Sequence, residues 1–215
     1  MIPDRLRLMV LTDRSAAGGR AVEWVVERAL AAGAPAVQLR DKSASARTLM
    51  ESARRLRALT AEYGALFLVN DRLDVALASG ADGAHLGPED LPLPAARALA
   101  PEGFVLGYST DDPDRARAAA SEGASYIGCG TIFPTHSKAD AGAAVGPDRV
   151  RAVARAAGIP VVAIGGIDTH NVAALAGCGA AGIAVLGAVM SAPDPGAATR
   201  ALLEGAAALA TCDVS

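Results

Sequence analysis

The chain has 215 residues, of which 52% are hydrophobic, 20% charged and 3% aromatic, and its formal net charge is −3. This composition excludes a disordered chain, and the pI near 5.6 gives no electrostatic reason to expect a nucleic-acid or membrane partner. A secretory signal and a bilayer-spanning run are both missing from the sequence, and the three widely spaced cysteines suggest free thiols. We therefore expect one cytoplasmic domain over residues 1–215.

Eight short apolar segments recur along the chain, and each is predicted to be a strand buried on both faces. Glycines at positions 33, 80, 123 and 179 precede four of the segments and fit the left-handed residue that ends a helix. In chain order the segments are LMVLTD (8–13), AVQLR (36–40), LFLVND (66–71), GAHLG (83–87), FVLGYS (104–109), YIGCG (126–130), PVVAIGG (160–166) and GIAVLG (182–187).

Amphipathic stretches separate several of these segments, with apolar residues at helical spacing near 22–30, 49–60 and 150–157. Alternating strands and helices in this number predict an α/β protein, a single (β/α)8 TIM barrel. An open flavodoxin-like sheet is the alternative, but such a sheet normally has about five or six strands.

Cations and glycines follow the predicted strands, at the rim where the active sites of such barrels lie. Arg40 ends the second segment, Lys42 lies two residues beyond it, and Lys138 follows the sixth. Each alone is typical of a solvated surface charge, whereas three at one rim suit an anionic ligand. Gly166 and Gly187 end the last two segments, which is the usual place for a phosphate in this fold.

Two acids lie at the ends of neighbouring strands: Asp71 is the last residue of the third segment, and Asp90 follows shortly after the fourth. Either one alone is compatible with a helix N-cap or a turn. Together they suit Mg²⁺, which takes one or two carboxylates and completes its shell with water and phosphate oxygens.

The histidines do not form a hydrolytic site, and the motifs HExxH, GxSxG, GxxxxGKS and GxGxxG are missing from the sequence. His85 lies within a predicted strand and is expected to be packed and hydrogen-bonded, and His170 is expected in the first turn of a helix. Of the three histidines, His136 is the one expected at the rim of the barrel. The residues thus favour phosphate-directed chemistry without a protein nucleophile.

Six segments between about residues 8 and 190 resemble, in order, the thiamine-phosphate synthase family. They read QLRDK, LVNDRLDVALASGADGAHLGPEDLP, LGYST, YIGCGTIFPTHSK, VVAIGGI and GIAVLGAV. The resemblance implies a TIM-barrel transferase that uses Mg²⁺. Its substrates are 4-amino-2-methyl-5-(diphosphooxymethyl)pyrimidine and a thiazole phosphate, and its products are thiamine phosphate and pyrophosphate. A dissociative path through a pyrimidine-methyl cation is expected.

The resemblance also implies roles for individual residues. Asp71 and Asp90 match the magnesium ligands, and Lys138, Arg40 and Ser109 match catalytic positions. The pyrimidine diphosphate is expected to contact Gln38, Leu39, Arg40, Asp41, Lys42, Asn70, Ser109 and Lys138, and the thiazole phosphate Thr135, His136, Ser137, Gly166, Leu186 and Gly187.

Two positions depart from the family pattern. Ser137 replaces a threonine and keeps its hydroxyl, so we expect little effect. Gly187 replaces the usual serine and loses a hydroxyl, so we expect weaker binding of the thiazole phosphate or a different thiazole substrate.

Two other functions remain open at this point. A thiazole tautomerase of the same superfamily would need a phosphate-binding site and a residue that transfers a proton. His136 is the candidate for the proton transfer. A non-catalytic sensor of thiazole or thiamine phosphates would need neither the acids nor Lys138. A homo-oligomer is compatible with either function.

Overall fold

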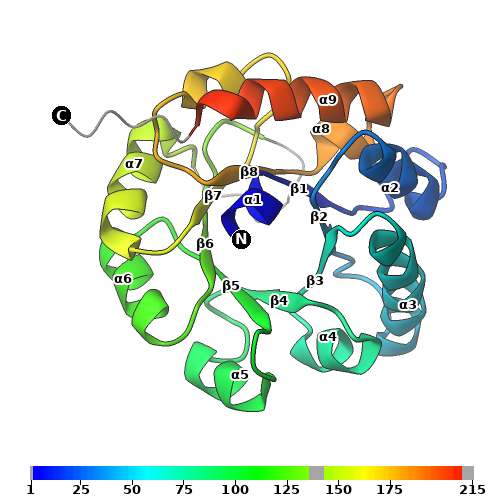
Figure 1. Ribbon diagram of the computed structural model, residues 1–215, viewed down its shortest axis with the longest axis horizontal. Coiled ribbons are helices and arrows are strands. Elements are labelled where there is room, and N and C mark those ends of the chain that lie inside the picture. Colours follow the sequence, from blue (N-terminus) through cyan, green and yellow to red (C-terminus); the bar gives the residue numbers. More distant parts are fainter. Residues whose placement is uncertain (1, 136–142, 210–215) are drawn as a thin grey trace.

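The computed structural model describes residues 2–135 and 143–209 and shows a closed barrel of eight parallel strands in sequence order (Figure 1). The predicted (β/α)8 barrel is thereby confirmed, and an open sheet is excluded. The strands are β1 (Leu8–Leu11), β2 (Ala36–Leu39), β3 (Leu66–Asn70), β4 (Gly83–Leu86), β5 (Val105–Ser109), β6 (Tyr126–Cys129), β7 (Val161–Ile164) and β8 (Gly182–Val185).

The helices form a ring around the barrel, except for α1, which lies across one open end in Figure 1. The connection between β7 and β8 holds only a short 3-10 helix, so this unit is not a full strand–helix repeat. The helical elements are α1 (Ile2–Leu6), α2 (Val22–Ala31), α3 (Ala46–Glu62), α4 (Leu73–Ser79), α5 (Leu93–Leu99), α6 (Pro113–Ser121), α7 (Gly146–Ala157), η1 (Val172–Leu175), α8 (Gly187–Met190), α9 (Pro195–Gly205) and η2 (Ala206–Ala208).

Local signals explain where these helices begin and end. Ser45 caps α3 by accepting a hydrogen bond from the Thr48 N–H at 3.2 Å. Gly80 adopts a left-handed conformation with φ of 67° at the end of α4, and the other three glycines predicted for this role also have positive φ. None of the helices in the described ranges is long and apolar enough to cross a membrane.

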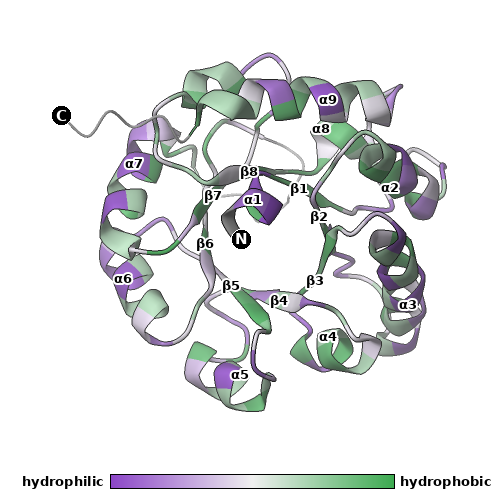
Figure 2. Cartoon of the chain, viewed as in Figure 1, coloured by the Kyte–Doolittle hydropathy of each residue, from purple (hydrophilic) through white to green (hydrophobic). Residues whose placement is uncertain are grey.

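The core has two layers because each strand buries both faces. Leu8 and Val10 of β1 pack outward against the helices, while Met9 and Leu11 point into the barrel. Figure 2 shows hydrophobic and hydrophilic stretches on the surrounding helices, as amphipathic elements require. Leu6 of α1 is fully buried with the inner cluster, so this helix helps to close the barrel at the end where the strands begin.

Candidate active site

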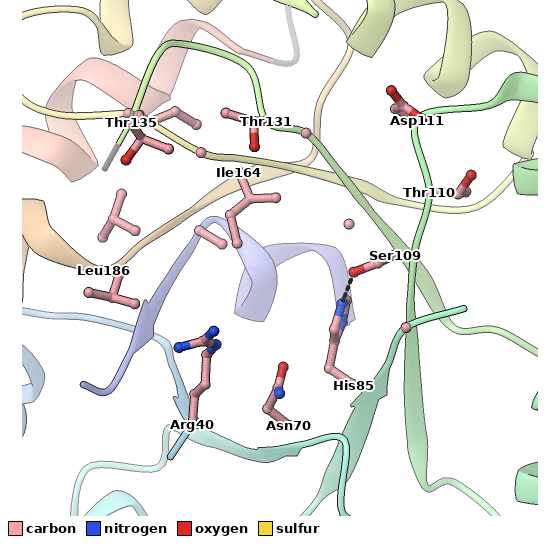
Figure 3. A pocket seen from close by; sticks show the side chains of 18 of the residues that line it. Arg40, Asn70, His85, Ser109, Thr110, Asp111, Thr131, Thr135, Ile164 and Leu186 are labelled. Carbon is pink, nitrogen blue, oxygen red and sulfur yellow. Dashed lines mark hydrogen bonds between the residues drawn. The ribbon is translucent and has the colours of Figure 1, made fainter. Parts of the chain in front are cut away.

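A cavity of about 1190 Å³ lies at the end of the barrel where the strands finish. All strands are parallel, so the residues that follow them meet at one mouth. Figure 3 shows Arg40, Asn70 and His85 on one side of the cavity and Thr131 and Thr135 on the other. The cavity is large enough for two small ligands side by side, since pockets for single drug-sized ligands have about 300–1000 Å³.

Arg40 and Lys42 bring positive charge to one side of this cavity. Arg40 directly follows β2, and its backbone N–H donates to Thr12 Oγ1 at 2.9 Å, which ties this loop to the end of β1. Its guanidinium lies 3.8 Å from Asp13 Oδ2, with only 10% of the side chain exposed. Burial would raise the pKa of Asp13, but hydrogen bonds from Ser15 and Ala16 lower it, so this partner is ionised and holds the arginine in place.

Asp71 and Asp90 lie next to these cations and interact with each other. Asp71 has a left-handed backbone with φ of 62°, which is uncommon outside glycine, and its N–H donates to the His85 carbonyl at 2.8 Å. Asp90 is held by the Gly87 N–H, which donates to Asp90 Oδ2 at 2.6 Å. The two carboxylates come from loops after adjacent strands, β3 and β4.

The electrostatic repulsion between the Asp71 and Asp90 carboxylates favours binding of a divalent cation between them. Burial, the charge of Asp90 and a hydrogen bond to Asp90 raise the pKa of Asp71 to about 6, while Lys42 and Arg40 oppose the shift. A cation between the carboxylates would relieve their repulsion. In the described residues there is no group of three or more histidine, cysteine or acidic side chains that could hold a metal. Two carboxylates are a donor set that suits Mg²⁺, which takes one or two such ligands and completes its shell with phosphate oxygens and water.

His85 is a cavity residue whose place sequence reasoning missed. The prediction of a packed, hydrogen-bonded histidine is confirmed: its Nε2 lies 2.8 Å from Ser109 Oγ and its Nδ1 2.8 Å from the Tyr126 hydroxyl. Its neighbours Ala84 and Leu86 point outward into the helix-facing core. Because side chains alternate along a strand, this pattern in GAHLG could have placed His85 inside the barrel.

The opposite side of the cavity is built from glycine turns. Gly165 and Gly166 have φ of 102° and 67°, which favour glycine. A Cβ on Gly166 would lie 2.4 Å from the Phe133 carbonyl oxygen, so the loops after β6 and β7 pack with no room for a side chain. Asn171 fixes the turn by donating from Nδ2 to the Gly166 carbonyl at 2.7 Å. Together with Gly187, this side offers backbone groups to a ligand. Asp168 is a charged lining residue beside this turn, and its carboxylate accepts hydrogen bonds from the His170 and Asn171 N–H groups.

The family model described as thiamine monophosphate synthase matches residues 8–189 of the chain. The chain belongs to this family. It is 48% identical over 197 residues to the thiamine-phosphate synthase of Moorella thermoacetica, which covers 92% of this chain and 94% of that protein. It is 46% identical over 193 residues to the thiamine-phosphate synthase of Methanospirillum hungatei, with 90% and 94% covered.

A solved structure of a thiamine phosphate pyrophosphorylase from Pyrococcus furiosus has a similar fold. It superimposes with a TM-score of 0.87 at 41% sequence identity and covers 96% of this chain and 98% of that one. Membership of the thiamine monophosphate synthase family thus extends across the whole barrel, including every strand end that contributes to the cavity.

Most of the site residues implied by the family resemblance line one cavity, which brings together residues far apart in the sequence. Their roles as metal ligands or substrate contacts stay predictions. The lining residues among them are Arg40, Lys42, Asn70, Asp71, Asp90, Ser109, Thr135, Gly166, Leu186 and Gly187.

Three implied residues lie elsewhere than the cavity wall. Gln38 is buried inside the barrel, where its Nε2 donates to Met9 Sδ at 3.1 Å. Leu39 packs in the core between barrel and helices. Asp41 closes a turn by accepting hydrogen bonds from Ser43 and Ala44. The remaining three, His136, Ser137 and Lys138, lie outside the described residues.

Proposed function

We propose that this protein is a thiamine-phosphate synthase, which condenses 4-amino-2-methyl-5-(diphosphooxymethyl)pyrimidine with a thiazole phosphate and releases pyrophosphate. The observation that carries the proposal is one cavity with two different sides. One side has paired carboxylates beside two cations, and the other has glycine turns. The similarity to proteins named thiamine-phosphate synthase, at 46–48% identity over nine-tenths of the chain, supports the same function.

The charged side suits the diphosphate. Arg40 offers a planar fork of donors and Lys42 a movable point charge, and both suit phosphate oxygens. Asp71 and Asp90 would hold Mg²⁺, which when bound supplies positive charge that stabilises the departing pyrophosphate. Lys138 is proposed for the same role on family resemblance, although it lies outside the described residues.

The reaction that we propose is dissociative. The bond between the pyrimidine methylene carbon and the bridging oxygen breaks, and both electrons leave with pyrophosphate. The thiazole nitrogen then gives its lone pair to the resulting cation and forms the new carbon–nitrogen bond. Arg40, Lys42 and Ser109 stabilise the negative charge that develops on the leaving group, and such electrostatic stabilisation is usually the largest single catalytic contribution.

The glycine side suits the thiazole phosphate. Backbone N–H groups at glycine turns and at the first residues of a helix have no partner within the helix and can face an anion. Gly166 and Gly187 line the cavity here, and Thr135 adds a hydroxyl. Gly187 is the first residue of α8, where family members usually carry serine, so this subsite is expected to bind more weakly.

One assay tests the proposal. The purified protein is incubated with the pyrimidine diphosphate, the thiazole phosphate and magnesium, and thiamine phosphate and pyrophosphate are measured. Absence of both products would refute a synthase. Isomerisation of a thiazole carboxylate that is lost in the His136→Ala variant would instead indicate the tautomerase.

A modified substrate tests the reaction path. An electron-withdrawing substituent on the pyrimidine should slow turnover severely, and an unchanged rate of the chemical step would contradict the dissociative path.

A further inference from the structure

A pair of polar side chains, His85 and Tyr126, lies inside the barrel beneath the cavity. Tyr126 is almost completely buried with the inner core cluster, whose other members, such as Met9 and Leu68, are apolar. A polar group in such surroundings is costly unless it is hydrogen-bonded. The Tyr126 hydroxyl lies 2.8 Å from His85 Nδ1, and His85 Nε2 lies 2.8 Å from Ser109 Oγ, as Figure 3 shows for the second contact.

The barrel makes room for this pair by omitting side chains from two strands. In the sheet register His85 of β4 pairs with Gly107 of β5, and Gly107 pairs with Tyr126 of β6. A Cβ on Gly107 would lie 2.2 Å from Tyr126 Cζ and 2.4 Å from His85 Nδ1. A Cβ on Gly128 would lie 2.9 Å from His85 Cε1. The two rings therefore meet over glycine, in a space that any larger residue would close.

The partners of Tyr126 indicate where its proton points. A hydrogen bond with the Gln38 side chain lowers the pKa of Tyr126, which is the effect of a donor to the phenol oxygen, and the same amide donates from Nε2 to Met9 Sδ. Burial raises the pKa of Tyr126 above its usual value, so the hydroxyl keeps its proton. For that proton, His85 Nδ1 at 2.8 Å is a much better acceptor than Met9 Sδ at 3.9 Å.

The direction of this bond fixes the remaining ones. A neutral imidazole that accepts at Nδ1 carries its proton on Nε2 and donates it to Ser109 Oγ. The Ser109 oxygen is then an acceptor inside the wall, and its own proton is left to point into the cavity. In the reverse arrangement the serine would donate to the histidine and turn a lone pair toward the ligand, which would repel an anion.

We propose that Gln38, Tyr126 and His85 form a one-way hydrogen-bond relay that holds the Ser109 hydroxyl as a donor to a phosphate oxygen. His85 and Tyr126 are then positioning residues, and Gln38 acts from within the barrel and not as a direct ligand contact. The ligand assigned to Ser109, a diphosphate, rests on the proposed function. The direction of the relay does not depend on that function: it is argued from the distances around Tyr126 and from the burial of its hydroxyl.

The first test reads the relay without any ligand. The chain has three histidines, so ¹⁵N spectra of the imidazole rings can be assigned with the His136→Ala and His170→Asn variants. We expect the His85 ring to accept at Nδ1 and to carry a proton on Nε2. Tyr126→Phe should remove this preference and give a ring that averages between tautomers, whereas the exposed Tyr63→Phe control should leave it unchanged. A proton on Nδ1 in the wild type, or an unchanged ring in Tyr126→Phe, would overturn the relay.

The second test measures the affinity for magnesium pyrophosphate by calorimetry in a double-mutant cycle. Tyr126→Phe should weaken binding about tenfold, as expected for a lost hydrogen bond to a charged group. In a Ser109→Ala background the same change should have little further effect. Equal losses in both backgrounds would mean that the tyrosine only supports packing, and would overturn the proposal.

A pair of His85 variants and two outcomes with the wild-type protein complete the tests. Should Tyr126→Phe not fold, His85→Gln, which keeps an N–H for Ser109, should bind pyrophosphate about tenfold more tightly than His85→Leu, which does not. Equal affinities would overturn the relay. Wild-type protein that binds pyrophosphate but forms no thiamine phosphate would refute the synthase and leave the relay standing. Wild-type protein without affinity for magnesium pyrophosphate would overturn the assignment of Ser109 as a phosphate donor.

Discussion

Replacement of Asp71 by asparagine should stabilise the metal-free protein while removing its response to magnesium. The Asp71 carboxyl is disfavoured in its charged form by burial and by Asp90, more than Arg40 and Lys42 favour it. Asparagine has the same shape without the charge, and its amide can donate to the Asp90 carboxylate. It also tolerates the left-handed backbone, with φ of 62°, better than most residues.

The size of the effect follows from the pKa of Asp71. Its rise from 3.8 to about 6 means that the folded state holds this proton more tightly than the unfolded state. At about 1.4 kcal/mol per tenfold change in proton affinity, ionisation destabilises the fold by at most about 3 kcal/mol. Asp71 is partly exposed, so solvent screening reduces this to roughly 1–2 kcal/mol. For a chain of this length the Asp71→Asn variant should melt about 3–6 °C higher at neutral pH.

The pH dependence has a defined sign. Wild-type stability without metal should fall as the pH rises from 3.8 to about 6 through ionisation of Asp71, and this part of the slope should vanish in Asp71→Asn. Melting curves recorded with a chelator and with magnesium test both claims, with Asp74→Asn as an exposed control that loses an ion pair to Arg72. A metal-free Asp71→Asn variant less stable than wild type, or an equal magnesium response in the two proteins, would refute the reasoning.

Three further predictions concern single positions of the cavity. Arg40→Lys should keep the fold but lower kcat/KM for the pyrimidine diphosphate about tenfold to a hundredfold, because lysine lacks the planar fork; unchanged kinetics would contradict this role. Gly187→Ser, at the first residue of α8 where serine can adopt the helical backbone, should lower KM for the thiazole phosphate about threefold to tenfold, and a raised KM would argue against a phosphate contact there. Gly166 has φ of 67°, and a Cβ there would lie only 2.4 Å from the Phe133 carbonyl oxygen. Gly166→Ala should therefore lower the free energy of unfolding, measured in urea, by about 2 kcal/mol or more. Unchanged stability would show that the loops after β6 and β7 separate easily.

The strands and their order were predictable from the sequence, because burial on both faces leaves a local record. Near-continuous apolar runs such as LMVL and VVAI mark the strands, and Gly80 marks the end of a helix through its backbone freedom. In a parallel barrel all strands finish at one mouth, so the order of elements was enough to place Arg40 and Asp71 at the same rim. These features depend on residues close together in the chain.

The contacts within the site were decided by the tertiary structure. In the sequence, Gln38, His85 and Tyr126 each look like ordinary strand residues. Gly107 and Gly128 give no sign that a side chain from another strand fills the space above them. Only the register that pairs His85 with Gly107 and Gly107 with Tyr126 brings the two rings together. The pKa of Asp71 likewise depends on its burial and on Asp90, which joins it across two strands. The alternation of residues along a strand determines which face of the sheet a side chain occupies. The side chains that it contacts there depend on how the barrel closes and how its strands are staggered, because these two features bring together residues that are distant in the chain.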